Sequence, residues 1–304
     1  MNSFWNRRQF LLAGAAAPLL AAGKPNSLFG GVQVGAITYS FRELPGSADQ
    51  VLQYCLDCGI SAIELMSNVA ESYAGAPLPK PGERGISAEL KQWRTSARMD
   101  KFKAFRKLYS DAGIKIYAFK LPPTMAMSDA EYDYIWNVAE TVGASHITME
   151  LPEDDALLNR VAAFAAKRKL RIAFHTHGQG GKSGFDKALA ASPYTALNLD
   201  VGHYFGVTGE SPVPVIEHYH DRISSLHLKD RKAPSPADKG VRGKGGANMP
   251  WGQGDTPLKD ILQTLKKNKY KIPASIEYEY KTPAGSDVLT EMKKCVQYCK
   301  EALA

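Results

Sequence analysis

Eight short runs of apolar, β-branched and aromatic residues alternate along this chain with stretches in which apolar residues recur every three or four positions. The helical stretches include 47–58, 98–111, 128–142 and 287–303, and Gly113 marks the end of the second. Eight strand-then-helix units without a hairpin signal predict a closed α/β barrel in a single domain rather than an open, doubly wound sheet. The predicted strands are 34–39, 62–66, 114–119, 145–151, 171–175, 196–200, 223–228 and 274–278.

Four of the predicted strands end in a carboxylate or an imidazole. Parallel strands bring their carboxyl ends to one face of a barrel, so these side chains are expected to meet. The gaps between them, about 50, 27 and 50 residues, leave room for one or two crossover helices each. The pattern predicts a divalent metal site built from Glu150, Asp200, His227 and Glu277.

Six motifs together carry a resemblance to a known family. The sequence resembles the xylose-isomerase-like TIM-barrel superfamily, within its sugar phosphate isomerase/epimerase group, over residues 32–303. The resemblance implies a (β/α)8 TIM barrel and an enzyme of sugars, although no single motif specifies a substrate. The motifs are GAITYSFR at 35–42, AIELM at 62–66, NLDVGH at 198–203, SLHLKD at 225–230, GQGD at 252–255 and SIEYE at 275–279.

The resemblance implies that one divalent ion is held by Glu, Asp, His and Glu at the ends of the later strands. Asp200, His227 and Glu277 match three of these positions, but His175 stands where keto-sugar epimerases carry a glutamate on the fifth strand. Either His175 or Glu150, at the end of the preceding strand, is expected to complete the set. His177 lies two residues after His175 and points the same way along a strand, so one imidazole could ligate while the other contacts substrate.

Mixed oxygen and nitrogen ligands favour Mn²⁺ or Zn²⁺, with Mg²⁺ and Co²⁺ as alternatives. Such an ion polarises a carbonyl and stabilises the enediolate that forms when the adjacent proton leaves. Family epimerases exchange that proton between two glutamates. The histidine on the fifth strand puts this scheme in doubt and would suit elimination or hydration equally well. The candidate acid–base residues are Glu277, Glu150 and His175.

Further polar or aromatic residues near the strand ends are candidate substrate contacts. Two segments rich in glycine or proline, 67–97 and 231–257, are expected to form long loops on the active-site side, with a lid over a polar ligand as the favoured interpretation. The candidates, besides His177, are Glu64, His203, Lys229, Asp230 and Trp251.

Residues 1–24 are expected to form a twin-arginine export signal. Arg7 and Arg8 precede an alanine-rich apolar stretch, 10–22, that is too short to anchor the chain in a bilayer. Cleavage is expected between Ala22 and Pro25, and no cysteine follows the stretch to carry a lipid. The mature enzyme is therefore expected in the periplasm without a membrane anchor, which favours an unphosphorylated substrate.

Charge and cysteine content add little to this picture. The net charge of +7 is spread along the chain, and the densest basic runs, 167–169 and 266–271, predict solvated helix faces rather than a nucleic-acid surface. The cysteines are interpreted as buried thiols, with a disulfide between the two close pairs as the alternative, because the first and last helices of a barrel are neighbours. The pairs are Cys55 with Cys58 and Cys295 with Cys299.

These observations favour a metal-dependent isomerase or epimerase of an unphosphorylated keto-sugar or related polyol, acting through an enediolate. The alternative is a lyase or hydratase of a 3-keto sugar or 3-keto-glycoside, similar to inosose dehydratase. An endonuclease-IV-like enzyme would require histidines on the early strands, whereas none precedes His146. A non-catalytic sugar-binding barrel is a third possibility. The expected partner is a small carbohydrate, and homo-oligomer formation stays open.

Overall fold

The computed structural model describes residues 23–77, 86–177, 181–241 and 244–304 of the 304-residue chain. The expected export signal, with Arg7 and Arg8, lies outside the described residues except for positions 23 and 24. The export signal and its cleavage therefore stay predictions.

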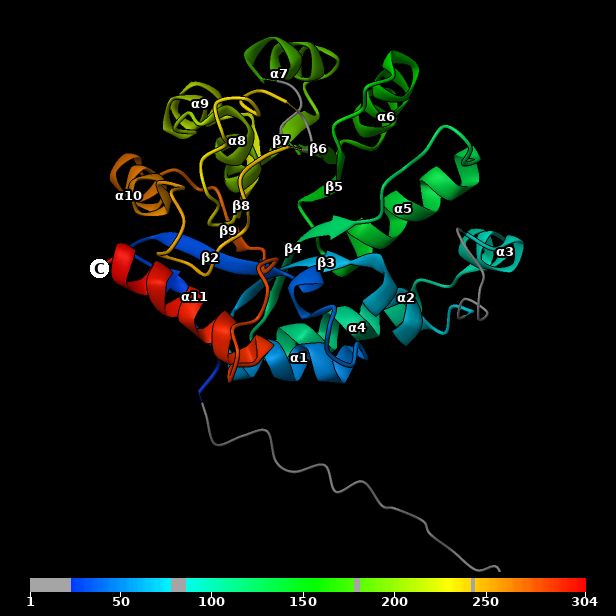
Figure 1. Ribbon diagram of the computed structural model, residues 1–304. Helices are drawn as coiled ribbons and strands as arrows, with labels where there is room; N and C mark the ends of the chain where they lie inside the picture. The colour runs from blue at the N-terminus through cyan, green and yellow to red at the C-terminus, as the bar shows by residue number, and fades with distance from the viewer. Residues whose placement is uncertain (1–22, 78–85, 178–180, 242–243) are drawn as a thin grey trace, which may run out of the picture.

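Eight parallel strands close into a barrel with helices around it (Figure 1). Each strand pairs with the next one in chain order, and the last pairs with the first through Val34 with Ala274 and Ala36 with Ile276. The predicted single-domain (β/α)8 barrel is confirmed. Its strands are β2 (Val32–Ile37), β3 (Ala62–Met66), β4 (Lys115–Lys120), β5 (His146–Glu150), β6 (Arg171–His175), β7 (Thr195–Asp200), β8 (Ile223–Leu228) and β9 (Ala274–Ile276).

Alternation along the strands separates the hydrophobic core from the polar interior of the barrel. In β7, Leu197 and Leu199 join the hydrophobic core, while Asn198 and Asp200 point to the opposite face of the strand. All six residues of β7 are buried, because helices cover the outside and side chains fill the inside. Closure therefore places buried polar groups at the carboxyl ends of neighbouring strands.

The helices predicted at 47–58, 98–111, 128–142 and 287–303 form with bounds that differ by at most two residues. Ser47 and Ser128 each form a capping box with a residue three positions on, Gln50 and Glu131. Gly143 ends α5 with a φ of 85°, a left-handed conformation that favours glycine. The helices that follow the strands are α1 (Ala48–Asp57), α4 (Asp100–Asp111), α5 (Asp129–Val142), α6 (Asp155–Arg168), α7 (Gly181–Ala190), α8 (Val201–Thr208), α9 (Val213–Tyr219), α10 (Leu258–Asn268) and α11 (Val288–Ala302), and a 3₁₀ helix, η1 (Thr38–Phe41), follows β2.

The segment 67–97 is not the long loop that its composition predicts. It contains α2 (Ser67–Ala74) and α3 (Ala88–Ser96), and its residues 78–85 lie outside the described part. A buried ion pair holds the two helices together: Arg94 of α3 donates from Nε and Nη2 to the carboxylate of Glu71, at 2.7 and 3.0 Å. The pairing partners lie far apart in the sequence, so local composition gave no sign of them.

Two strand predictions also need correction. The chain does contain a hairpin, because β1 (Leu28–Phe29) pairs antiparallel with β2 across Gly30 and Gly31, which both have positive φ. The eighth barrel strand ends at Ile276 rather than Tyr278, although the amide of Glu277 still donates to the carbonyl of Leu228. Glu277 therefore lies just beyond the strand, at the barrel mouth.

The segment 231–257 is a loop, as predicted; its described residues contain no helix and a single bridge, between Arg231 and Asn248. Asp230 fixes the end of this loop by accepting hydrogen bonds from the amides of Gly252 and Gly254, at 2.8 and 2.9 Å. A Cβ at Gly254 would lie 2.0 Å from Asp230 Oδ1, so this position requires glycine. The loop is thus tied to the end of β8.

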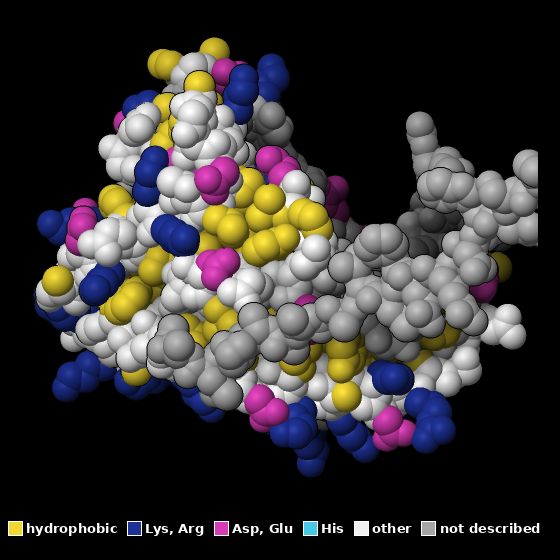
Figure 2. All heavy atoms as spheres, turned by 90° about the horizontal axis from the view of Figure 1, so that it is seen from below, with side chains coloured by type: hydrophobic (Ala, Val, Ile, Leu, Met, Phe, Trp, Pro, Cys, Tyr) yellow, Lys and Arg dark blue, Asp and Glu magenta, His cyan; other side chains and the backbone are white. Residues whose placement is uncertain are grey.

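All four cysteines are free and buried. This agrees with their interpretation as buried thiols and not with the alternative disulfide. Within the described ranges, no helix combines the length and apolar character needed to cross a membrane. On the face shown in Figure 2, basic and acidic side chains are interspersed around a patch of hydrophobic ones.

Candidate metal centre

Four buried side chains meet at the carboxyl ends of β6, β7, β8 and β9. Each offers one ligand atom, and these atoms all lie within 4.8 Å of one another. Strand register produces this proximity, since Asp200 pairs directly with His227 and Glu277 follows the paired end of β9. The residues, which we call the metal group, are His175, Asp200, His227 and Glu277.

Between the two candidates for the fourth position, the structure brings His175 into the metal group and leaves Glu150 outside. The carboxylate of Glu150 instead pairs with Lys120 Nζ at 3.2 Å and with His177 Nδ1 at 2.9 Å. Its side chain is 43% exposed, whereas that of His175 is buried. Lys120 at the end of β4 draws Glu150 away from the group, an interaction that strand-end positions alone do not reveal.

Glu64 does not lie free as a substrate ligand or base; it supports His227. Its Oε2 lies 2.7 Å from His227 Nε2, and it accepts further hydrogen bonds from Thr148 Oγ1 at 2.7 Å and Asn198 Nδ2 at 3.3 Å. Burial alone would raise the pKa of Glu64, but the adjacent His227 lowers it to about 2. Glu64 is therefore a buried carboxylate that orients an imidazole of the metal group.

The buried polar layer beneath the metal group was missed by sequence reasoning. Ser225 accepts a hydrogen bond from Asn198 at 2.7 Å and bonds His146 Nε2 at 2.9 Å. A signal was present: a polar residue stands two positions before the strand-end residue in β5, β7, β8 and β9, and such residues share one face of a strand. The four are Thr148, Asn198, Ser225 and Ser275.

Lys229 lies among the acidic side chains of the site. Its Nζ is 3.0 Å from Asp200 Oδ2, 3.1 Å from Glu277 Oε2 and 2.8 Å from Glu279 Oε2. Burial lowers the pKa of this lysine, but the three carboxylates outweigh burial and raise it above its ordinary value. Lys229 therefore carries a positive charge beside two members of the metal group.

His203 lies above Lys229 at the mouth. Its Nε2 is 2.8 Å from Lys229 Nζ, and its Nδ1 is 2.6 Å from a guanidinium nitrogen of Arg231, a residue that sequence reasoning missed. Burial and these two cations lower the pKa of His203 to about 2. The imidazole of His203 is neutral and lies where a substrate could meet it.

His175 at the end of β6 and His177 just after it face the same mouth. His175 Nδ1 is 2.8 Å from Asn198 Oδ1. Because an amide oxygen only accepts hydrogen bonds, Nδ1 of the neutral imidazole carries the proton and Nε2 has the lone pair. His175 Nε2 lies 3.1 Å from His177 Nε2. Burial, reinforced by Lys120, holds the pKa of His175 well below its ordinary value. A neutral imidazole suits either metal ligation or proton acceptance.

Two expected substrate contacts lie elsewhere. The carboxylate of Asp230 does not face the mouth freely, because it accepts hydrogen bonds from backbone amides of the 231–257 loop and so anchors that loop. Trp251 packs against Tyr298 of α11, with ring centroids 5.7 Å apart, and lines a separate cavity. Neither residue contacts a member of the metal group.

The metal group fits a divalent ion by its chemistry. Two carboxylates and two imidazoles are the oxygen and nitrogen ligands that such ions accept. Asp200 Oδ2 is buried and, despite the nearby Lys229, accepts no well-aligned hydrogen bond among the described residues. This oxygen can therefore act as a ligand of a metal ion.

Comparisons with known proteins find similar proteins for this part of the chain. The family model of the xylose isomerase-like TIM barrel matches residues 156–300, the part that contains all four members of the metal group. An inosose dehydratase from Clostridium botulinum (strain Eklund 17B / Type B) is 31% identical over 158 residues, which are 47% of this chain and 52% of that protein. The match thus spans about half the length of that relative.

Solved structures extend the likeness over the whole barrel. The probable 3-DHS dehydratase of Bacillus anthracis superposes with a TM-score of 0.60 at 15% identity, covering 88% of this chain and 99% of that one. An L-ribulose 3-epimerase superposes with a TM-score of 0.59 at 12% identity, covering 90% and 94%. At such identities the likeness concerns the fold, and the chain folds as a xylose isomerase-like TIM barrel.

Proposed function

We propose that this protein is a divalent-metal-dependent sugar isomerase or epimerase that acts on an unphosphorylated keto-sugar or related polyol. The observation that carries the proposal is the metal group: four buried ligands of mixed type, at the strand ends where barrel enzymes place their chemistry. The matching family model and the sugar enzymes among the relatives support it. Mn²⁺ and Zn²⁺ are the favoured ions.

When bound, a divalent ion would polarise the substrate carbonyl and stabilise an enediolate. The chain supplies the proton transfers. Glu277 is the candidate base: burial would raise its pKa, but Lys229 and His227 hold it well below its ordinary value, so it is ionised. His175 is neutral, and its Nε2 can serve either as a ligand of the ion or as the group that takes up or returns a proton on the other side, but not as both at once. His203, at the mouth, is the candidate contact for a substrate hydroxyl, whereas Lys229 is already engaged by carboxylates and by His203.

The mouth also supports a neutral substrate. The sequence contains no glycine-rich phosphate loop of recognisable spacing, and the expected export would remove the enzyme from cytoplasmic sugar phosphates. The two lysines at the mouth are already paired, Lys120 with Glu150 and Lys229 with three carboxylates, and the guanidinium of Arg231 contacts His203 and the carbonyl of Gly246. Neither Lys120 nor Lys229 is therefore left unpaired to bind a phosphate.

Elimination or hydration beside a ketone is the second candidate, and two observations favour it. The imidazole of His177 lies between His175 and the carboxylate of Glu150, 3.1 and 2.9 Å away, an arrangement suited to delivering a proton to a leaving hydroxyl. The curated relatives that match the chain are named inosose dehydratases. In this reaction Glu277 would remove the proton and a histidine would protonate the leaving group.

Incubation with keto-sugars, an inosose and 3-keto-glycosides in D₂O, followed by NMR, separates the two reactions. An isomerase or epimerase would place deuterium beside the carbonyl and form an isomer of unchanged mass apart from the label. A dehydratase would form an unsaturated or diketone product that lacks one water. Metal-loaded protein that exchanges no proton and forms no product with the whole panel would refute the proposed function.

A further inference from the structure

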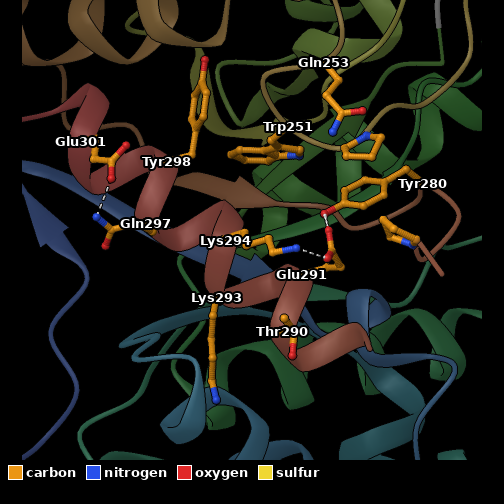
Figure 3. A pocket seen from close by; sticks show the side chains of 12 residues that line it. Trp251, Gln253, Tyr280, Thr290, Glu291, Lys293, Lys294, Gln297, Tyr298 and Glu301 are labelled. Atoms are coloured by element: carbon orange, nitrogen blue, oxygen red, sulfur yellow. Dashed lines mark hydrogen bonds and ion pairs between the residues drawn. The ribbon is translucent and has the colours of Figure 1, made fainter. Parts of the chain in front are cut away.

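A cavity of about 750 Å³ lies outside the barrel mouth, between the 231–257 loop and α11 (Figure 3). Its volume falls within the range of about 300–1,000 Å³ that is typical of small-molecule sites. No member of the metal group lines it. The cavity therefore belongs to a different site, whose walls come from Trp251, Gln253, Tyr280, Glu291, Gln297 and Tyr298.

Aromatic rings form the walls of this cavity. Trp251 and Tyr298 meet at 88°, so they make a corner, and Tyr280 lines the cavity as a third ring (Figure 3). The hydroxyl of Tyr280 donates to Glu291 at 2.9 Å, which fixes the orientation of the ring. Rigid aromatic faces of this kind suit a flat ligand with an apolar face.

The polar groups around the rings carry little net charge. Glu291 is paired with Lys294 at 2.6 Å, and Gln297 donates to Glu301 at 2.7 Å. Gln253 and Gln297 offer both donors and acceptors, whereas Trp251 Nε1 is a buried donor with no hydrogen-bond partner among the described residues. A neutral ligand rich in hydroxyl groups would match these groups better than an ion.

We propose that this cavity binds a neutral pyranose ring. A sugar ring presents an apolar C–H face to an aromatic side chain and hydroxyl groups around its edge, which matches aromatic walls with amide groups beside them. The choice of carbohydrate as the ligand class rests on the proposed function. Asp230 binds the amides of Gly252 and Gly254 on either side of Gln253, and its neighbour Lys229 lies in the mouth. The cavity thus adjoins the active site through one loop, as a place for a second ring of a glycoside or for a separate sugar.

The test uses saturation-transfer NMR and tryptophan fluorescence with methyl β-D-glucopyranoside and cellobiose, neither of which presents a ketone. Wild-type protein should bind at least one of these probes, and treatment with EDTA should leave binding unchanged. Tyr298→Leu, which removes an aromatic wall, should weaken it about tenfold, while Tyr298→Phe should keep it. Gln297→Ala, at an exposed position of α11, should weaken it about threefold without affecting the fold.

The outcomes separate this inference from the proposed function. Binding that needs Tyr298 but not the metal supports the cavity even if the enzyme proposal fails. Binding that EDTA abolishes and Tyr298→Leu leaves intact would place the sugar in the barrel mouth and overturn the inference. Absence of binding by wild-type protein at about 50 mM of each probe, well above the usual millimolar limit for weak ligands, would also overturn it.

Discussion

At the residue scale, the site is a balance of buried charges around His227 and Lys229. His227 lies between Glu277, 2.5 Å from Nδ1, and Glu64, 2.7 Å from Nε2. Burial lowers the pKa of His227, but the two carboxylates raise it to about 10. Without a metal, the positive charge beside Asp200 and Glu277 therefore comes from protonated His227 and from Lys229. A divalent ion has to enter against these charges.

Lys229→Met should bind the metal more tightly than the wild type does. The lysine ammonium lies 3.0 and 3.1 Å from two of the proposed ligands, and its removal takes away a repulsion that is worth about tenfold or more in affinity at such distances. Titration calorimetry with Mn²⁺ measures the change. Lys232→Met, an exposed lysine paired with Asp255, is the matched control and should change nothing. Weaker binding by Lys229→Met would show instead that the ammonium positions the carboxylates.

Among the helices, α2 and α3, which lie between β3 and β4, form a unit with α5 that is held by buried polar contacts. Glu71 of α2 accepts from Arg94 of α3 and from the hydroxyl of Tyr134 of α5, at 2.9 Å. Both members of the ion pair have only 6% of their side chains exposed. The three helices are therefore coupled through one carboxylate.

Glu71→Ala should lower the free energy of unfolding by about 3–5 kcal/mol, because it leaves the Arg94 charge buried without its partner. Urea denaturation followed by circular dichroism measures the effect. Glu89→Ala removes an exposed glutamate of α3 and should change the free energy by no more than about 0.5 kcal/mol. If the two variants are equally stable, the buried ion pair does not hold these helices.

The hydrophobic pattern predicted the barrel because each strand requires only a local apolar run. The strands β3, β6 and β8 have the predicted bounds. The helices α2 and α3 could not be predicted in this way, since their stability depends on Glu71 and Arg94 meeting across 23 residues of proline- and glycine-rich sequence. Nor could the hairpin of β1, whose two residues are too few to show a period.

The candidate site also contains features that local sequence predicts and features that depend on distant residues. Asp200, His227 and Glu277 follow from strand ends and meet as expected. The partners of these side chains do not follow from the strand ends. The sequence left His175 and Glu150 as alternatives for the fourth ligand. The contact with Lys120 that draws Glu150 away depends on the register between β4 and β5, which the sequence pattern does not give. Glu64 and Asp230 were recognised as polar residues at strand ends, but their partners on other strands and loops give them supporting roles.

At the scale of the whole molecule, closure of the barrel brings the first and last helices together. The Sγ atom of Cys58, just after α1, lies 3.9 Å from the carbonyl oxygen of Leu289 in α11. Burial raises the pKa of Cys58 and Cys295 to about 12, so their thiols are protonated and poor nucleophiles at neutral pH. The cysteines contribute to packing between the two ends of the chain.

None of the four thiols should react with Ellman's reagent in the folded protein, and all four should react in guanidinium chloride without a reductant. The measurement compares the absorbance of released thionitrobenzoate in the two conditions. Two reactive thiols in denaturant would reveal a disulfide, and rapid reaction in buffer would show that the junction between the helices opens.

The metal group of His175, Asp200, His227 and Glu277 is proposed to hold one divalent ion. Its most direct test is elemental analysis of wild-type, Asp200→Asn, Glu277→Gln and Glu150→Gln proteins, each loaded with Mn²⁺ or Zn²⁺ and dialysed, with thermal unfolding as the control for folding. We expect about one ion per chain in wild type and in Glu150→Gln, and loss of most of the metal in the other two variants. Full metal content in Asp200→Asn and Glu277→Gln, or a loss confined to Glu150→Gln, would show that the ion is not held by the metal group.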